Sequence, residues 1–258
     1  MYDVMHQAAQ YIAAVGKSFL ESVPDGNHTN MRWDSAACAM VGRPIDEAKE
    51  ISLALNYSSY SLEFVDTNVD VLASLYLGGS RHDAILFWIQ EQTDLLGIEG
   101  DLDFDIQYEL PYPAMEMDMV FPEEDSNELQ RLSDMRTAVQ NALSTVLNPI
   151  AAAREIRVWP HHFDIGSMII TQVEDNALVS SIGVGMAVPD AMVDDFYLFT
   201  TAWRRDGVGL DNMANLTLGK WRNPDWNGAT LEAGELSEAE MVVFFQETIG
   251  TLAQLLLS

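Results

Sequence analysis

The stretch from Trp159 to Asp164, which reads Trp-Pro-His-His-Phe-Asp, holds the residues of this chain that are best suited to chemistry. Proline has no N–H to give to a sheet, so a bulge or a sheet edge is expected here, and such a feature can aim side chains into a pocket. If Phe163 faces the core, His162 and Asp164 share the opposite face. On that face a carboxylate can orient an imidazole as a base or a metal ligand.

A metal site at this stretch would need one or two further ligands, for which the candidates are His28, His161, Asp194 and Asp195. The His-x-Asp spacing is common, and neither a His-Glu-x-x-His pattern nor a cysteine pair accompanies it. The alternative is a structural histidine that bonds to the backbone or to a carboxylate while the neighbouring rings fill the core. We therefore assign no metal and no cofactor.

Large aromatic residues gather in the second half of the chain. Rings alternate along 196–199 so that both faces of one strand carry them, which requires two covered faces or one face that lines a cavity. The loop 204–228 is long enough to cap a pocket, although core packing is the simpler alternative. The residues that we expect to line a ligand pocket are His28, Trp159, His162, Asp164, Trp203, Trp221 and Trp226.

Standard catalytic signatures are missing from the sequence. Gly183-Val184-Gly185 lacks the third glycine and the following helix of a dinucleotide loop, and neither a Walker-type loop nor a Gly-x-Ser-x-Gly elbow is present. The run 101–106 alternates aspartates with apolar residues and could hold calcium, but it lacks the glycine and distal glutamate of common calcium loops. A strand with one solvated carboxylate face is the expectation.

The first half of the chain carries both helical and strand patterns. Helical spacing of apolar residues predicts a helix over 3–22, and short apolar runs predict strands over 33–41, 51–57, 60–66 and 70–77. Ser80 and Asp83 form a capping-box pattern that predicts a helix over 81–97. The proline-containing segment 107–123 is expected to be irregular, as a lid or a crossover.

The second half repeats the order of helix, strands and helix. A helix is predicted over 126–147, and a last helix opens with Ser237 and Glu240. The strands between them are expected at 155–159, 164–173, 177–187, 195–202 and 229–233. Clustered strands with flanking helices indicate an α+β fold with mainly antiparallel sheet and a weak internal duplication. We expect one compact domain over 1–258, with 1–123 and 124–258 as its two halves.

The charge of the chain limits its partners. Thirteen Lys and Arg residues stand against 40 Asp and Glu residues, which gives a net charge of −27. This field repels phosphate backbones and anionic lipid surfaces, so neither nucleic acid nor membrane is an expected partner. The acid-rich, lysine-poor composition fits a solvated surface, a saline habitat or a basic partner.

The cysteine content and the N-terminus point to a cytoplasmic protein. Cys38 is the only cysteine, and its apolar neighbours predict a buried, inert thiol. The chain starts without a basic region followed by an apolar core, and no run of 18 apolar residues occurs.

Several motifs together resemble a family of uncharacterised, mostly bacterial proteins that is catalogued only as a domain of unknown function. They are Gly16-Lys17, Pro24 with Asn27-His28, Trp159 with Phe163-Asp164, Phe196-Tyr197, Trp221 with Trp226, and Phe244-Phe245-Gln246. The resemblance spans nearly the whole chain. It implies a compact α+β unit and assigns no reaction.

The chain departs from the pattern of that family at two places. Thr29-Asn30 stands where the family has two tryptophans, and Pro160-His161-His162 replaces a Gly-Ser pair. Because the similar proteins do without the two histidines, the resemblance argues against a catalytic role for them. His28, Trp159, Phe163 and Asp164 are the residues that carry over.

Three functions remain open on the sequence alone. The first is a cytoplasmic small-molecule-binding protein with an aromatic-lined pocket. The second is an enzyme, for instance a metal-assisted hydrolase, with His162 as ligand or base and Asp164 as its partner. The third is an acidic interaction module for a basic partner. The oligomeric state is not indicated.

Overall fold

The chain has an α+β fold that divides into two compact units. In this computed structural model, residues 1–46, 48–106, 108–211, 213–223 and 226–257 are described. The first unit holds Met1–Thr137 and Val158–His161, and the second holds Ala138–Arg157 and His162–Ser258. The division falls inside a long helix, whereas the sequence suggested halves that meet near residue 124.

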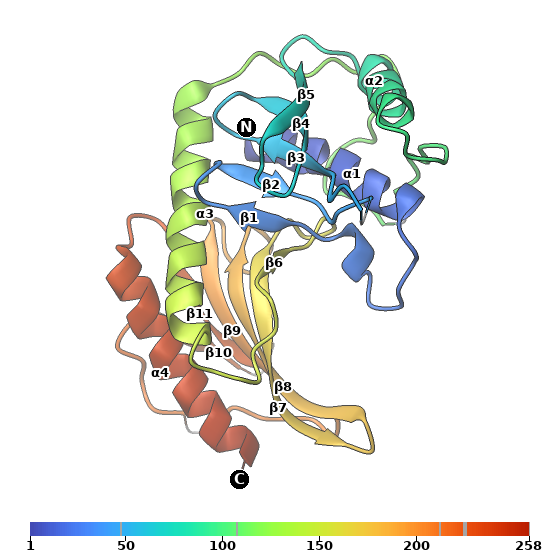
Figure 1. Cartoon of the computed structure of the whole chain (residues 1–258). Coiled ribbons are helices and arrows are strands. Elements are labelled where there is room, and N and C mark those ends of the chain that lie inside the picture. The colour runs from blue at the N-terminus through green and yellow to red at the C-terminus, as the bar shows by residue number, and fades with distance from the viewer. Residues whose placement is uncertain (47, 107, 212, 224–225, 258) are drawn as a thin grey trace. The chain divides into compact units, whose positions relative to one another are not determined.

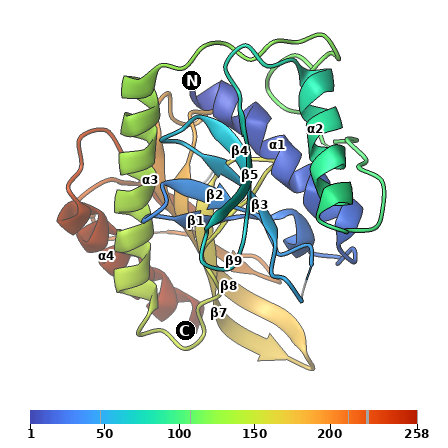
Figure 2. The ribbon, with the colours of Figure 1, turned by 45° about the horizontal axis from the view of Figure 1, so that its top comes forward.

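The first unit has helix α1 and a five-stranded antiparallel sheet (Figure 1). Its elements in chain order are α1 (Tyr2–Phe19), the 3-10 helix η1 (Asn27–Thr29), β1 (Arg32–Asp34), β2 (Ala39–Val41), β3 (Ser52–Asn56), β4 (Ser61–Val65), β5 (Val71–Tyr76) and α2 (His82–Leu95). Each strand pairs with the next, so the sheet is a simple meander. Figure 2 shows α1 along one face of this sheet. Ile12 of α1 lies close to Gly42, which follows β2. The predicted strand 33–41 forms two strands, because a turn interrupts it.

The predicted strand over 101–106 is wrong. The segment has no strand pairing, although its apolar side chains are half-buried and its aspartates are exposed, as the alternation indicated. Its backbone is held by side chains, since the Asp103 N–H donates to Ser18 Oγ and the Leu102 N–H to Gln90 Oε1. Two of its carboxylates pair with Lys17. The alternation therefore matches the exposure of the side chains, but no strand in the described part of the chain pairs with the segment.

The second unit contains a six-stranded antiparallel sheet and the last helix. Helix α3 (Ser126–Leu147) runs from the first unit into the second. The strands are β6 (Arg157–Val158), β7 (Ile165–Glu174), β8 (Ala177–Ala187), β9 (Tyr197–Arg204), β10 (Lys220–Arg222) and β11 (Gly228–Glu232), in the spatial order β10-β11-β9-β8-β7-β6. Asp175 and Asn176 both have positive φ, as the tight turn between β7 and β8 requires. Strand β10 lies within the segment that was predicted to be a loop.

Helix α4 (Glu238–Leu257) covers the face of this sheet that carries Thr200. Thr200 and Thr248 share a buried hydroxyl hydrogen bond of 2.8 Å, and Phe244 and Phe245 are fully buried.

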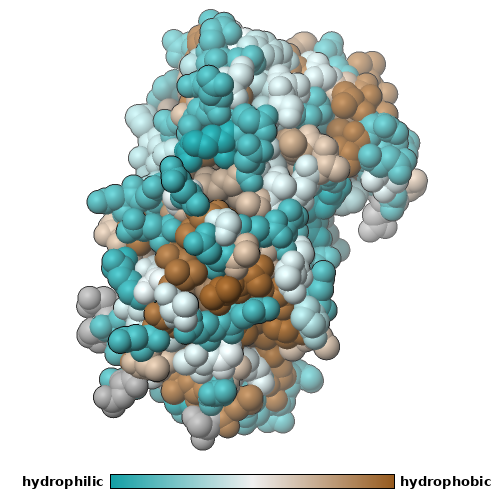
Figure 3. Space-filling model, turned by 90° about the vertical axis from the view of Figure 1, so that its left-hand side faces the viewer, coloured by the Kyte–Doolittle hydropathy of each residue, from teal (hydrophilic) through white to brown (hydrophobic). Residues whose placement is uncertain are grey.

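In a search of the described residues, α4 is the helix that is long and apolar enough to cross a membrane, with 39% of the tested window buried. Core helices pass the same test. Figure 3 shows apolar side chains gathered on one face of the molecule. Helix α4 exposes Val243 and Leu257.

Of the two predicted capping boxes, one forms. Ser237 and Glu240 bond reciprocally at the start of α4, since the Ser237 N–H donates to Glu240 Oε2 and the Glu240 N–H to Ser237 Oγ. The box predicted for α2 is wrong, because the Ser80 hydroxyl donates instead to the carbonyl of Tyr76.

Cys38, which was predicted to be buried, is only half-buried and lies in a turn with a φ of 52°.

Candidate functional site

A pocket in the first unit lies between α1, η1 and the residues Asp105, Ile106 and Tyr108. It encloses about 340 Å³, and we call it the α1–η1 pocket. Its lining residues are Gln10, Ala13, Ala14, Lys17, Ser22, His28, Thr29, Asp105, Ile106 and Tyr108. A second, more open hollow of about 520 Å³ adjoins η1 from the side of Arg43 and Glu50, and His28 lines it as well. His28 therefore belongs to the walls of both spaces.

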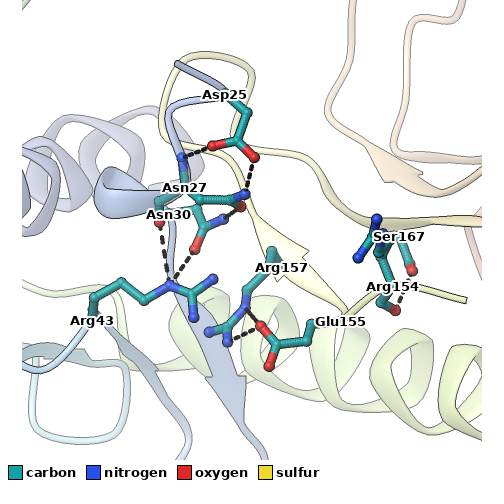
Figure 4. A network of polar contacts seen from close by, with 8 residues as sticks. All are labelled: Asp25, Asn27, Asn30, Arg43, Arg154, Glu155, Arg157 and Ser167. Atoms are coloured by element: carbon teal, nitrogen blue, oxygen red, sulfur yellow. Dashed lines mark hydrogen bonds and ion pairs between the residues drawn. The ribbon is translucent and has the colours of Figure 1, made fainter. Parts of the chain in front are cut away.

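The short helix η1, which carries His28, is held by a polar network (Figure 4). Asp25 accepts hydrogen bonds from the backbone N–H and the side-chain amide of Asn27, and the Asn30 amide donates to Asn27 Oδ1 at 2.7 Å. The Nε of Arg43 donates to the carbonyl oxygen of Asn27 and to Asn30 Oδ1. Gly26 precedes η1 with a φ of 71°, which suits glycine. These bonds fix the backbone at His28.

Gly16 of α1 sets how closely η1 approaches this helix. A Cβ atom on Gly16 would lie 2.3 Å from the carbonyl oxygen of His28, a distance that no real Cβ contact allows. Two motifs of the family resemblance, Gly16-Lys17 and Asn27-His28, are thus brought together by a contact between backbones. A side chain at position 16 would separate the walls of the pocket.

The imidazole of His28 is half-buried and is bonded to the backbone through one ring nitrogen. The backbone N–H of Val23 donates to Nδ1 at 3.4 Å, so Nε2 holds the hydrogen. Within the described part of the chain, no hydrogen bond to Nε2 is found. The arrangement lacks the oriented imidazole of a general base and fits a hydrogen-bond donor to a ligand.

Lys17 is committed to the protein. Its Nζ lies 2.9 Å from Asp103 Oδ2 and 3.5 Å from Asp105 Oδ2, and it also donates to the Asp105 carbonyl at 2.9 Å. The hydrogen bond to Asp103 raises the pKa of Lys17 above its usual value. A protonated lysine with all donors occupied is neither a nucleophile nor a free anion site.

A buried cluster of polar side chains lies next to the pocket and includes two of its lining residues, Gln10 and Tyr108. His6 Nε2 and Gln10 Nε2 both bond to the carbonyl oxygen of Pro160, at 2.7 and 2.9 Å. The Tyr108 hydroxyl donates to Gln10 Oε1, and His6 Nδ1 bonds to the Tyr112 hydroxyl. Burial raises the pKa of Tyr108 and of Tyr112, so both phenols stay neutral. Pro160 thus anchors the predicted Trp159–Asp164 stretch to α1.

Trp159 reaches the pocket only through other rings. It makes an edge contact with His161, with ring centroids 6.1 Å apart, and His161 makes another with Tyr108 at 5.8 Å. Of the residues predicted to line a pocket, His28 does so, and Trp159 contacts His161, which in turn contacts the lining residue Tyr108. Both belong to the first unit.

His162 and Asp164 belong to the second unit and lie outside any strand, although the sequence predicted that they share one face of a strand. Phe163 is buried, as expected, but it has a φ of 56° outside any strand, so the alternation that would place its neighbours on one face is broken. His162 is exposed and Asp164 is half-buried. The negative charge of Asp164 contributes to raising the pKa of Tyr197, after burial and the bond to Asp190.

The other three tryptophans that were predicted to line a pocket lie on different faces of the second sheet. Trp221 pairs with Ala229, and Ala229 with Thr200, which places Trp221 on the face covered by α4. Trp203 points to the other face, where it is 45% exposed, and Trp226 packs there against Phe199. These side chains therefore do not line one common wall.

A metal centre finds no support among the residues that the structure describes, because no group of three His, Cys, Asp or Glu side chains is close enough to hold an ion. The pocket residues that the sequence did not predict as lining residues include Gln10, Lys17 and Tyr108. Lys17 had a signal, since it follows the glycine of the family motif. Gln10 and Tyr108 had none, because their roles depend on contacts across about a hundred residues of sequence.

Comparison of the chain with protein-family models, with curated proteins and with solved structures gave no match. The resemblance to a family of unknown function stays a prediction.

Proposed function

We propose that this chain is a small-molecule-binding protein whose ligand occupies the α1–η1 pocket. The observation that carries the proposal is a cavity of about 340 Å³ lined by His28, whose Nε2 has no partner within the described residues. Ligand pockets are commonly of this size and combine apolar walls with a few polar groups. Here Ala13, Ala14 and Ile106 supply the apolar walls.

The polar lining favours a ligand that donates hydrogen bonds. The hydroxyl oxygens of Ser22, Thr29 and Tyr108 and the carboxylate of Asp105 can each accept one, while the Nε2–H of His28 is a free donor. Lys17 is occupied by carboxylates. Together with the net charge of −27, this lining disfavours anions. A compact neutral or cationic molecule with several hydroxyl or amino groups is the ligand class that we propose.

A cytoplasmic location belongs to the same proposal. A single, half-buried free cysteine suits a reducing compartment, in which disulfides are rare.

The experiment is a ligand screen by saturation-transfer NMR on the full chain, with polyols, sugars and amines as one set and small carboxylates and phosphates as the other. The affinity of each hit is then measured for the His28→Ala variant and for the control variant His162→Ala, which removes an exposed histidine of the second unit. We expect hits from the first set only, weakened roughly five- to tenfold by His28→Ala, because one hydrogen bond is lost. Equal binding to both variants, or hits confined to the anions, would refute the proposal.

The competing hypothesis of a metal-assisted hydrolase predicts a different result. Elemental analysis of protein purified without a histidine tag would then find stoichiometric metal, and His162→Ala would lose it. Either finding would count against the pocket as the main site.

A further inference from the structure

The four edges of the two sheets differ in how they are protected against pairing with another chain. Natural sheets keep their edges short, charged or covered. Strand β6 has two residues, β10 has three and carries Lys220 and Arg222, and β1 carries Arg32 and Asp34. Next to β1, Met31 and Val158 also exchange backbone hydrogen bonds of 3.0 and 2.8 Å.

Strand β5 is neither short, charged nor covered by another strand in the described part of the chain, and the one irregularity in its pairing with β4 lies at its start, beside Val71. It spans six residues, Val71–Tyr76, and contains no charged residue, no proline and no glycine. Val71 is 53% exposed, Leu72 48% and Tyr76 44%, whereas β4 beside it is buried throughout. Figure 2 shows β5 at the end of the five-stranded sheet, beyond β4. In a chain with one charged residue in five, an exposed uncharged edge of this length requires an explanation.

The backbone of β5 is arranged to accept another strand. The N–H of Leu77 donates to the carbonyl of Tyr60 at 2.9 Å, and in antiparallel pairing such bonded pairs alternate with non-bonded ones. Ser61–Tyr76 and Glu63–Ser74 are therefore non-bonded pairs. The N–H groups of Ser74 and Tyr76 and the carbonyl of Ser74 point away from β4, where no strand lies in the described part of the chain.

The charges at both ends of β5 identify the kind of partner. Asp66 and Asp70 precede the strand, and at its other end the Tyr76 hydroxyl donates to Glu123 and lies near Glu124. The nearby cation Arg81 is paired with Asp83 at 2.7 Å. An antiparallel second copy would bring the acidic start of one strand against the acidic end of the other, so charge disfavours self-association.

We propose that β5 is a docking edge for an extended segment of a basic protein partner, which adds to the sheet as a further strand. Main-chain hydrogen bonds to Ser74 and Tyr76 would hold the segment, its apolar residues would cover Val71 and Leu72, and flanking Lys or Arg residues would meet the carboxylates. This proposal is independent of the α1–η1 pocket, because none of the residues that line that pocket belongs to β5.

The test uses three synthetic peptides and the full chain. All three have the same alternating Val-Thr core; the first is flanked by lysines, the second by glutamates, and the third by lysines with N-methylated core amides. Hydrogen exchange of the amides of Ser74 and Tyr76 is followed by NMR at low and at high salt. We expect the first peptide alone to slow this exchange, and roughly tenfold weaker binding at high salt.

Two variants connect binding to the edge. Ser74→Pro removes an outward N–H, which an edge strand tolerates, and Val71→Lys adds a charge to the edge without touching a β4–β5 hydrogen bond. Both should abolish binding with the thermal unfolding midpoint of the chain unchanged, and Val71→Lys decides the matter if Ser74→Pro fails to fold. Failure of the lysine-flanked peptide to protect Ser74, or unchanged binding to Val71→Lys, overturns the proposal. Protection of Ser74 that rises with protein concentration in the absence of peptide would identify a second copy instead and overturns it too.

Discussion

Gly16 and His28 meet through their backbones, so that a Cβ atom at position 16 would lie 2.3 Å from the carbonyl oxygen of His28. Ala13, Ala14 and Lys17 of α1 and His28 and Thr29 of η1 form adjoining walls of the α1–η1 pocket. The absence of one side chain in α1 therefore determines where the imidazole of His28 stands. A glycine inside a helix lowers helix stability by up to about 1 kcal/mol relative to alanine, and here the close contact accounts for it.

Gly16→Ala is expected to destabilise the chain by about 1–3 kcal/mol, because the new methyl group meets backbone atoms that cannot rotate away. Urea unfolding gives the free energy. Gly250→Ala in α4 is the matched control, since nothing lies within 4 Å of its Cβ position and the better helix propensity of alanine should stabilise by about 0.5–1 kcal/mol. If both substitutions stabilise the chain, the contact at Gly16 is not as close as described.

Arg43→Met should cost about 1–3 kcal/mol and weaken ligand binding in the pocket. Its Nε donates to two groups of the η1 network, and one acceptor belongs to the fully buried Asn30, which would be left without that donor. Arg131→Met is the comparison, because Arg131 pairs with Glu128 on an exposed face of α3 and such pairs contribute less than 1 kcal/mol. Equal losses of stability in the two variants would show that the hydrogen bonds of Arg43 to the η1 network stabilise the chain no more than an exposed ion pair does.

The elements that could be predicted from the sequence are those whose signals are local. Helix α3 and strand β8 have the predicted bounds, 126–147 and 177–187, because apolar periodicity and turn residues lie within each element. The capping box of Ser237 and Glu240 is similar, since three residues separate its partners. The segment 101–106 failed for the opposite reason. Its alternation was genuine, but a strand also requires a neighbour, and Lys17 takes up two of its carboxylates instead.

The candidate site could be predicted only in part. His28 was singled out and does line the pocket, whereas the indoles expected beside it lie elsewhere. Phe163 explains why the prediction for the stretch Trp159–Asp164 failed. Its left-handed backbone ends the alternation that would have placed His162 and Asp164 on one face of a strand. A positive φ at a bulky residue has no sequence signal. Contacts such as Tyr108 to Gln10 arise only when distant segments fold together.

His82 should make the stability of the chain depend on pH near neutrality. Its imidazole is buried, bonds to the Tyr11 hydroxyl at 2.7 Å, and has its pKa lowered by burial. Because the folded pKa lies below the unfolded one of about 6.5, the unfolded chain binds the proton first as the pH falls. The contribution of His82 is thus complete above about pH 6.5 and is lost below it. Urea unfolding at several pH values between 5 and 8 should give a flatter dependence for His82→Gln than for the natural chain, and parallel curves would contradict the assignment.

The acidic surface predicts a stability that rises with salt and then levels off. With a net charge of −27 and few cations, repulsion between carboxylates disfavours the compact state, and this repulsion weakens as the Debye length falls from about 30 Å at 0.01 M to about 8 Å at 0.15 M salt. The thermal midpoint should therefore increase mainly below roughly 0.2 M NaCl and flatten above it. A steady rise up to molar salt would indicate exclusion of salt from the protein surface in place of screening. In that case the composition would reflect adaptation to saline surroundings more directly than it reflects a basic partner, whose attraction to β5 is largest when salt is low.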